Sequence, residues 1–215
     1  MSTNAAPHWD LSNIYPGLDS AEFKSALEEL TKQISDLESF FNEQISAADA
    51  ATPPDQLATL AGEMIKQFNQ TSDLAETIEA YIFSFISTDS FNQVAKKLDS
   101  QFQQTYVRLQ MLGVQGQQWI GSIADVLPSI LEIDGAAKEH AFYLRETAEQ
   151  SRYLMSEAEE SLAAELGLSG TSAWAKLQGT VTSQMSIEFE LDGEIQKLSS
   201  PALINLHSHP DENVR

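Results

Sequence analysis

The four histidines of this sequence are the side chains best suited to bind a metal ion or transfer a proton; they are His8, His140, His207 and His209. None is followed by glutamate, so the dipeptide His-Glu does not occur. A His-Glu-x-x-His zinc helix needs that dipeptide, because it supplies a metal ligand and the general base together. No histidine has glutamate three residues before it, so the Glu-x-x-His pattern of di-metal carboxylate proteins is absent as well.

His207 and His209 form the best candidate for a metal pair. Side chains two residues apart on a continuous helix point about 200° from each other, so these two share an ion only if the helix ends between them. Two surface histidines at a helix end explain the pattern without a metal, and we prefer that interpretation. His140 lies on an apolar stripe with Leu144 and Ala148, which indicates a histidine in or beside the core.

Clustered carboxylates offer a second kind of chemistry, that of paired acids. The clusters are Glu28-Glu29 and Glu157 with Glu159 and Glu160. Both lie at the starts or on the polar faces of predicted helices, where acidic side chains interact favourably with the positive helix end or with water. We therefore interpret them as solvated capping charge.

Trp174 could stack on a ligand. However, it begins an i, i+3, i+7 stripe with Leu177 and Val181, and this pattern predicts a tryptophan in the core. The sequence thus gives no catalytic, cofactor-binding or metal-binding residue for this chain.

The amino-acid composition limits the classes of molecule that the protein can bind and the kinds of site it can form. The 215 residues include 12 Lys and Arg against 32 Asp and Glu, for a net charge of −20, which opposes binding to nucleic acid or an anionic membrane. There is no cysteine, which excludes disulfides and thiolate metal sites. No secretory signal is visible at the start, and no apolar run approaches the roughly 20 residues of a membrane span. We expect a cytoplasmic protein.

Apolar residues at alternating spacings of three and four predict a mainly α-helical fold of long antiparallel helices. The predicted helices cover about 19–41, 53–86, 90–113, 117–133, 136–152, 156–167 and 169–181. Gly113 is a plausible helix end, and Pro128 should end or kink the helix around it. Before the first helix, Trp9, Leu11, Ile14 and Tyr15 are expected to pin the N-terminus onto the body.

The apolar period changes from 3.6 to 2 after the last long helix. One β-hairpin is predicted near residues 185–198, with Asp192-Gly193 as its turn, followed by a short helix from Ser200-Pro201. His209-Pro210 then predicts the first turn of another helix, which indicates a piece of a longer protein. We expect two parts, an N-terminal helical bundle over 1–113 and a helical region with the hairpin over 114–215.

Two stretches resemble a known family. One is Trp9-Asp10-Leu11-Ser12-Asn13-Ile14-Tyr15, leading into a long helix; the other runs from Tyr153 to Leu177 and contains Gly170-Thr171-Ser172-Ala173-Trp174. Together with Ser200-Pro201 and the segment His209 to Arg215, they resemble the N-terminal half of the oligoendopeptidase F group of M3 metallopeptidases.

The resemblance implies the N-terminal, substrate-restricting part of a zinc-dependent oligoendopeptidase that hydrolyses short peptides. In that family a His-Glu-x-x-His helix and a later glutamate hold zinc in the C-terminal domain, so the resemblance carries no catalytic residue into this chain. We therefore expect the chain alone to be inactive, and to expose an apolar face, capable of self-association, where the missing catalytic domain docks. The alternatives are a non-enzymatic module that binds a peptide or protein, and a stand-alone scaffold that has lost the chemistry.

Overall fold

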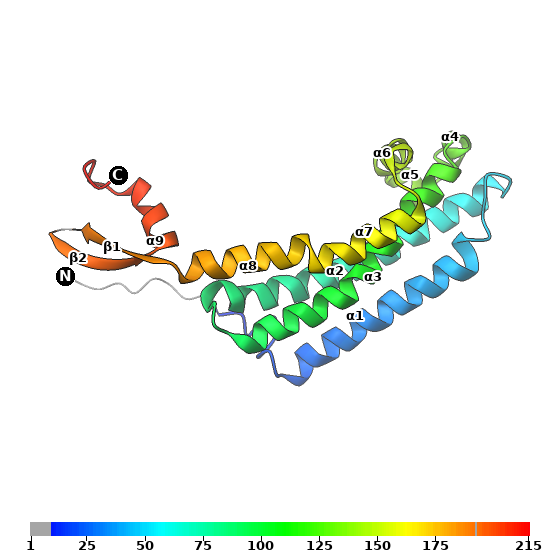
Figure 1. Cartoon of the computed structure of the whole chain (residues 1–215). Helices are drawn as coiled ribbons and strands as arrows, with labels where there is room; N and C mark the ends of the chain where they lie inside the picture. The colour runs from blue at the N-terminus through cyan, green and yellow to red at the C-terminus, as the bar shows by residue number, and fades with distance from the viewer. Residues whose placement is uncertain (1–9, 192) are drawn as a thin grey trace.

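Three long helices form the body of the protein in a computed structural model that describes residues 10–191 and 193–215. They are α1 (Ala21–Phe40), α2 (Pro54–Thr88) and α3 (Gln93–Ser122), which pack side by side (Figure 1). A π-helical turn, Phe41–Ile45, extends α1. Each helix begins where the sequence provides a start signal: Ser20 and Asn92 cap α1 and α3 through their side chains, and Pro54 lies in the first turn of α2.

The predicted apolar stripes of these helices meet in one core. Phe23, Leu30, Ile34 and Leu37 of α1 are buried, as the periodicity predicted, and the facing core residues of α2 and α3 include Leu57, Met64, Ile78, Ile82, Phe102, Leu109 and Leu112. Two polar contacts add to this packing. Arg108 of α3 forms two hydrogen bonds with the Glu38 carboxylate of α1, at 2.9 and 2.7 Å, and the buried Trp119 indole donates to the Ala48 carbonyl at 2.8 Å.

Short helices close one end of the body: α4 (Leu127–Ile130), α5 (Ala136–Glu139), α6 (Ala141–Gln150) and a 3₁₀ turn, Ser151–Tyr153. Gly121 lets this turn approach α3 closely, because a Cβ added there would stand 2.2 Å from the Ser151 Oγ atom. We call residues 10–153 the bundle.

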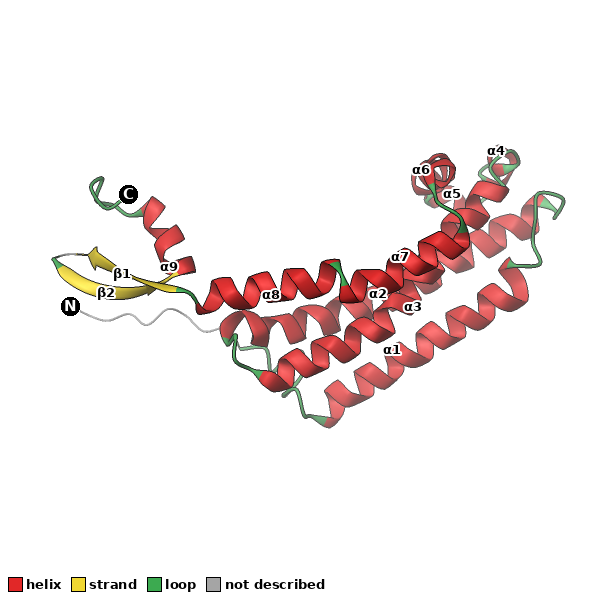
Figure 2. Cartoon of the chain, viewed as in Figure 1, coloured by secondary structure: helices red, strands yellow, loops and turns green. Residues whose placement is uncertain are grey.

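The remaining residues, 154–215, form an arm. Its helices α7 (Glu157–Ser169) and α8 (Thr171–Gln184) run along the bundle, and the hairpin of β1 (Ser186–Leu191) and β2 (Glu194–Ser199) lies beyond them (Figures 1 and 2). The strands pair from Ser186 with Ser199 to Leu191 with Glu194, and Gly193 takes a positive φ of 79° in the turn. Helix α9 (Ser200–Asn205) and a 3₁₀ turn, Leu206–Ser208, follow.

The structure confirms a mainly α-helical fold with one β-hairpin, but it corrects three helix predictions. Helix α3 continues through Gly113 to Ser122, because packing of the flanking turns outweighs the roughly 1 kcal/mol cost of one helical glycine. The predicted division between residues 113 and 114 therefore falls inside a helix. Pro128 lies in the first turn of α4 and does not end a helix, since its missing N–H is not needed there.

The third correction concerns the last residues. Residues 209–215 form a turn, not the first turn of a regular helix, although the Arg215 N–H donates to the Asp211 carbonyl at 3.4 Å. At the other end, Tyr15 packs edge-on against Phe23 and Tyr81, as predicted, whereas Ile14 is exposed and Trp9 lies outside the described residues. None of the described helices is long and apolar enough to cross a membrane.

Candidate functional site

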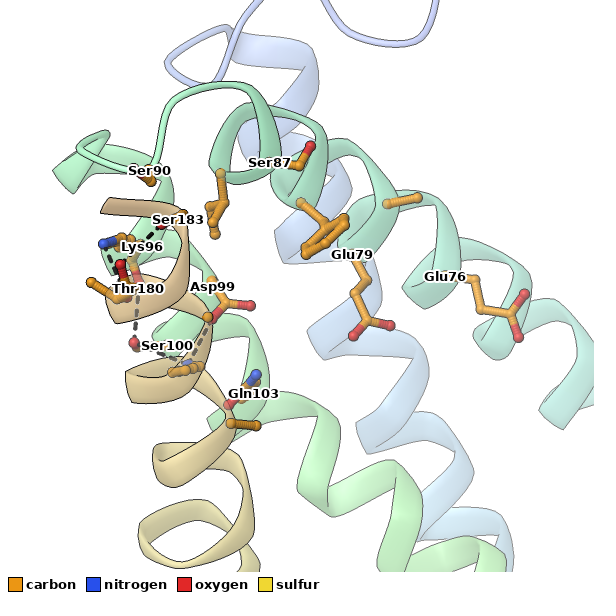
Figure 3. Close-up of a pocket in the computed structure, with 16 residues that line it drawn as sticks. Glu76, Glu79, Ser87, Ser90, Lys96, Asp99, Ser100, Gln103, Thr180 and Ser183 are labelled. Carbon is orange, nitrogen blue, oxygen red and sulfur yellow. Dashed lines mark hydrogen bonds and ion pairs between the residues drawn. The ribbon is translucent and has the colours of Figure 1, made fainter. Parts of the chain in front are cut away.

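A pocket of about 870 Å³ lies between α2, α3 and α8 (Figure 3). Its volume is within the range of ligand-binding pockets, roughly 300–1,000 Å³. Helix α2 contributes an apolar wall of Ala80, Phe83 and Ile86, and the Phe83 side chain is 62% exposed. Helix α8 contributes small residues, including Ala175 and Gly179, so the space between the helices is not filled by side chains.

An ion pair connects α8 to α3 at this pocket. The Lys176 Nζ atom lies 2.6 Å from an Asp99 carboxylate oxygen and 3.5 Å from the Ser100 hydroxyl. The Asp99 side chain is only 18% exposed, so water screens the pair less than it screens a pair on an open surface. Lys176 and Asp99 thus neutralise each other and fix the position of α8 over the pocket.

The α2 wall carries two further carboxylates, Glu76 and Glu79, that line the pocket. They lie one helical turn apart, and within the described residues neither forms an ion pair with a lysine or arginine. Partial burial raises the pKa of the nearby Tyr106 phenol, and the negative charges of Glu79 and Glu76 raise it further. This end of the pocket is therefore negatively charged.

The opposite end of the pocket carries a cation. The Lys96 Nζ atom lies 3.5 Å from the Thr180 hydroxyl of α8, and no carboxylate of the described chain pairs with it. Figure 3 shows Lys96 beside Thr180 and Ser183, away from Glu76. The pocket is thus an apolar groove with an acidic end and a basic end.

His140, His207 and His209 lie elsewhere, and His8 lies outside the described residues. His207 and His209 fall on either side of a helix end: the His207 Nδ1 atom is 3.0 Å from the Ile204 carbonyl, and the His209 Nδ1 atom accepts from the Asp211 N–H at 3.1 Å. His140 is exposed at the break between α5 and α6, so its assignment to the core or its boundary is wrong. Over residues 10–191 and 193–215, no three histidine or acidic side chains gather in a possible metal site.

Glu159 and Glu160, in the first turn of α7, cap the start of that helix, as predicted. One Glu159 oxygen accepts from the Ser156 N–H at 2.9 Å and from the Ser156 hydroxyl at 2.6 Å, and these hydrogen bonds lower the pKa of Glu159. Glu160 accepts from the Met155 N–H at 3.0 Å. Glu29 accepts from the Gln33 side chain on α1, which leaves Glu28 and Glu29 on the exposed face of that helix.

The assignment of Trp174 to the core is wrong, because its side chain is 70% exposed. Leu177 and Val181, the other members of its stripe, are each 51% exposed. Helix α8 turns its small and polar residues toward the pocket and its apolar stripe toward solvent. Leu162 and Leu166 of α7 are exposed as well, so the arm carries an uncovered apolar surface along both helices.

This arm and the end of the bundle also carry the relationship to known proteins. Residues 124–186 match a family model described as Peptidase_M3_N, Oligopeptidase F. This region of the chain is therefore similar to the N-terminal region of oligopeptidase F. No curated protein matches the chain, and no solved structure matches it. The match includes α7 and α8 and excludes α2 and α3, so the oligopeptidase F-like region supplies only one wall of the pocket.

Sequence reasoning missed the pocket. Glu76, Glu79 and Lys96 occupy ordinary polar positions of long helices, and nothing in their spacing indicates that α8 lies across them. The available signal was the composition of α8, whose glycine, alanine and hydroxyl residues alternate with the apolar stripe and leave space on one side of the helix.

Proposed function

We propose that this chain is the N-terminal, substrate-restricting part of a zinc-dependent oligoendopeptidase and that it does not cleave peptides by itself. The observation that carries the proposal is the match of residues 124–186 to the oligopeptidase F N-terminal family. The sequence contains no His-Glu dipeptide, and in our proposal the zinc-binding helix lies outside these 215 residues.

The uncovered apolar surface of the arm supports this proposal. Trp174, Leu177 and Val181 lie on one stripe of α8, which is the pattern of a helix that packs against a neighbour. Contiguous apolar surface of this kind marks an interface more often than a free surface. In our proposal the catalytic domain covers this stripe, and the bundle behind it limits access to short, unfolded peptides.

The proposal is tested by the size of the native protein in its source cell, detected with an antibody raised against residues 1–215. We expect a band far above the 23.7 kDa of this chain, and purification of that species should yield peptidase activity that a zinc chelator abolishes. A native band at 23.7 kDa would contradict the proposal. Zinc-dependent cleavage by the purified 215-residue chain would contradict the assignment of catalysis to another part.

The pocket favours a second candidate, a module that binds a peptide or protein without cleaving it. A groove with an apolar wall and charged ends can hold a ligand with no catalytic group nearby. The two candidate functions differ in whether another domain covers the apolar stripe of α8, and so in the association state expected of the isolated chain. A stand-alone module should be a monodisperse monomer, whereas a peptidase part without its catalytic domain should self-associate through the uncovered arm.

A further inference from the structure

We infer that the groove between α2, α3 and α8 binds short free peptides, with the N-terminal ammonium at Glu76 and Glu79 and the C-terminal carboxylate at Lys96. Binding itself concerns this chain alone; the identification of these peptides as substrates or products rests on the proposed function.

The charges of the groove decide the orientation. Lys176 and Asp99 neutralise each other at 2.6 Å, so neither offers a free charge to a ligand. Glu76 and Glu79 at one end, and Lys96 at the other, have no ion-pair partner in the described part of the chain. A free peptide has opposite charges at its two ends, and it complements this arrangement in one direction only.

The length of the groove limits the peptide to a few residues. Along α2 the lining residues from Glu79, at the acidic end, to Ser87 span a rise of about 12 Å at 1.5 Å per residue. An extended peptide advances about 3.3 Å per residue, so about four residues span the two charged ends. A longer free peptide would place one terminus beyond its charged partner.

The walls of the groove suit apolar peptide side chains. Phe83 is 62% exposed although it lies among Ala80 and Ile86, and a peptide side chain in the groove would cover it. The Ser87 and Ser100 hydroxyls donate to the Ser84 and Lys96 carbonyls of their own helices, so their oxygens can accept hydrogen bonds from the N–H groups of a peptide backbone. The bound ligand is therefore a tetrapeptide with apolar central residues and free ends.

The test uses the tetrapeptide alanyl-leucyl-phenylalanyl-alanine in four forms: free, N-acetylated, C-amidated, and blocked at both ends. Calorimetric titration of the 215-residue chain should rank the free form tightest. Each blocked end should weaken binding about five-fold, because an exposed ion pair is worth up to about 1 kcal/mol. The free peptide has no net charge, so the net charge of −20 does not attract it unspecifically.

Substitutions of the charged groove residues test which of them binds each terminus of the peptide. E76Q with E79Q should weaken the free and C-amidated peptides about five-fold and leave the N-acetylated peptide unchanged. Lys96→Gln should weaken the free and N-acetylated peptides and leave the C-amidated peptide unchanged. Matched controls with the same charge changes on exposed helix positions, E28Q with E146Q and Lys24→Gln, should leave all affinities as they are. Ala80→Trp, which fills the groove from an exposed position, should abolish binding.

Equal affinity for all four peptides, or equal loss in the groove variants and the controls, would overturn the inference, as would the absence of binding at millimolar peptide. These results are separate from the test of the proposed function. If the native protein is 23.7 kDa and binds the free peptide, the inference about the groove holds and the proposed function is wrong. If the native protein is a larger peptidase and its 215-residue part does not bind the peptide, the proposed function holds and the inference about the groove is wrong.

Discussion

The bundle and the arm use the same apolar residue types in opposite ways. Among the described residues, the buried apolar core lies between Phe23 and Ala148, and the arm includes no buried side chain. Trp119 in the bundle is buried and donates a hydrogen bond from its indole, while Trp174 in the arm is mostly exposed. Helix α7 of the arm forms because it packs on α3 of the bundle and begins with a strong local signal, the cap of Ser156 and Glu159.

This difference shows what an amphipathic pattern specifies. A stripe at helical spacing selects the face of a helix that is to be covered, but the covering surface need not belong to the same segment or the same chain. In the bundle the cover is a neighbouring helix of this chain. In the arm the stripe of α8 faces away from the nearest helices.

The largest effect should come from removing a core aromatic of the bundle. Phe102 is 2% exposed and stacks on Tyr106 with ring centroids 5.4 Å apart. Phe102→Ala should lower the free energy of unfolding by about 3–5 kcal/mol, because the side chain leaves a cavity in a closed core. Urea denaturation followed by circular dichroism measures this change. A loss below 1 kcal/mol would mean that the bundle core is not closed around Phe102.

A smaller effect should follow from adding one methyl group where the bundle is tightest. Gly121→Ala should cost about 1–3 kcal/mol, since the new Cβ would stand 2.2 Å from Ser151 Oγ. The matched control is Gly113→Ala on the same helix, which meets nothing within 4 Å and should stabilise the protein by about 0.5–1 kcal/mol. If both substitutions have the same effect, the close approach of α3 and the 3₁₀ turn does not exist.

The ion pair between Lys176 of the arm and Asp99 of the bundle should affect local opening of α8 more than the free energy of unfolding of the whole protein. Lys176→Gln should change the free energy of unfolding by less than about 1 kcal/mol, because the pair is partly exposed. It should nevertheless speed amide hydrogen exchange along α8, which has no buried side chain to hold it. Lys32→Gln, which removes the exposed pair with Asp36 on α1, is the control. Exchange in α8 that stays at the wild-type rate would show that another contact fixes the helix.

The smallest effect on stability should come from the arm's own tryptophan. Trp174→Ala should change the free energy of unfolding of the isolated chain by less than about 1 kcal/mol, because little of its surface is buried. The same substitution should reduce self-association, which analytical ultracentrifugation measures over a range of concentrations. A loss of 3–5 kcal/mol would restore the interpretation of Trp174 as a core residue.

Local signals predicted most of the fold. The helix predicted over 19–41, the hairpin turn at Gly193 and the capping role of Glu159 depend on neighbours in the sequence, and all three are present. The predictions for Gly113 and Pro128 were wrong because glycine occurs both at the end and inside a helix, and proline both after a helix and in its first turn. Tertiary packing decides which position each residue takes.

Local sequence signals could not predict the candidate site, because the site is formed by helices that are far apart in the sequence. It is a space between α2, α3 and α8, and α8 is separated from α2 by residues 89–170 of the chain. Which polar residues face that space depends on how the arm lies on the bundle. The described histidines, with Glu28, Glu29, Glu159 and Glu160, have the types of side chain that carry out chemistry, but they cap helices or face solvent.

Gly170, at the junction of α7 and α8, has φ and ψ of −94° and −101°, outside the helical region, while α7 packs on α3 and α8 continues past it (Figure 1). Helices of 13 and 14 residues placed end to end form a lever about 40 Å long. A tilt of about 5° in such a lever moves its far end by about 3.5 Å. A small tilt of α7 and α8 about their contact with the bundle would therefore displace the hairpin further than any other part of the arm's two helices.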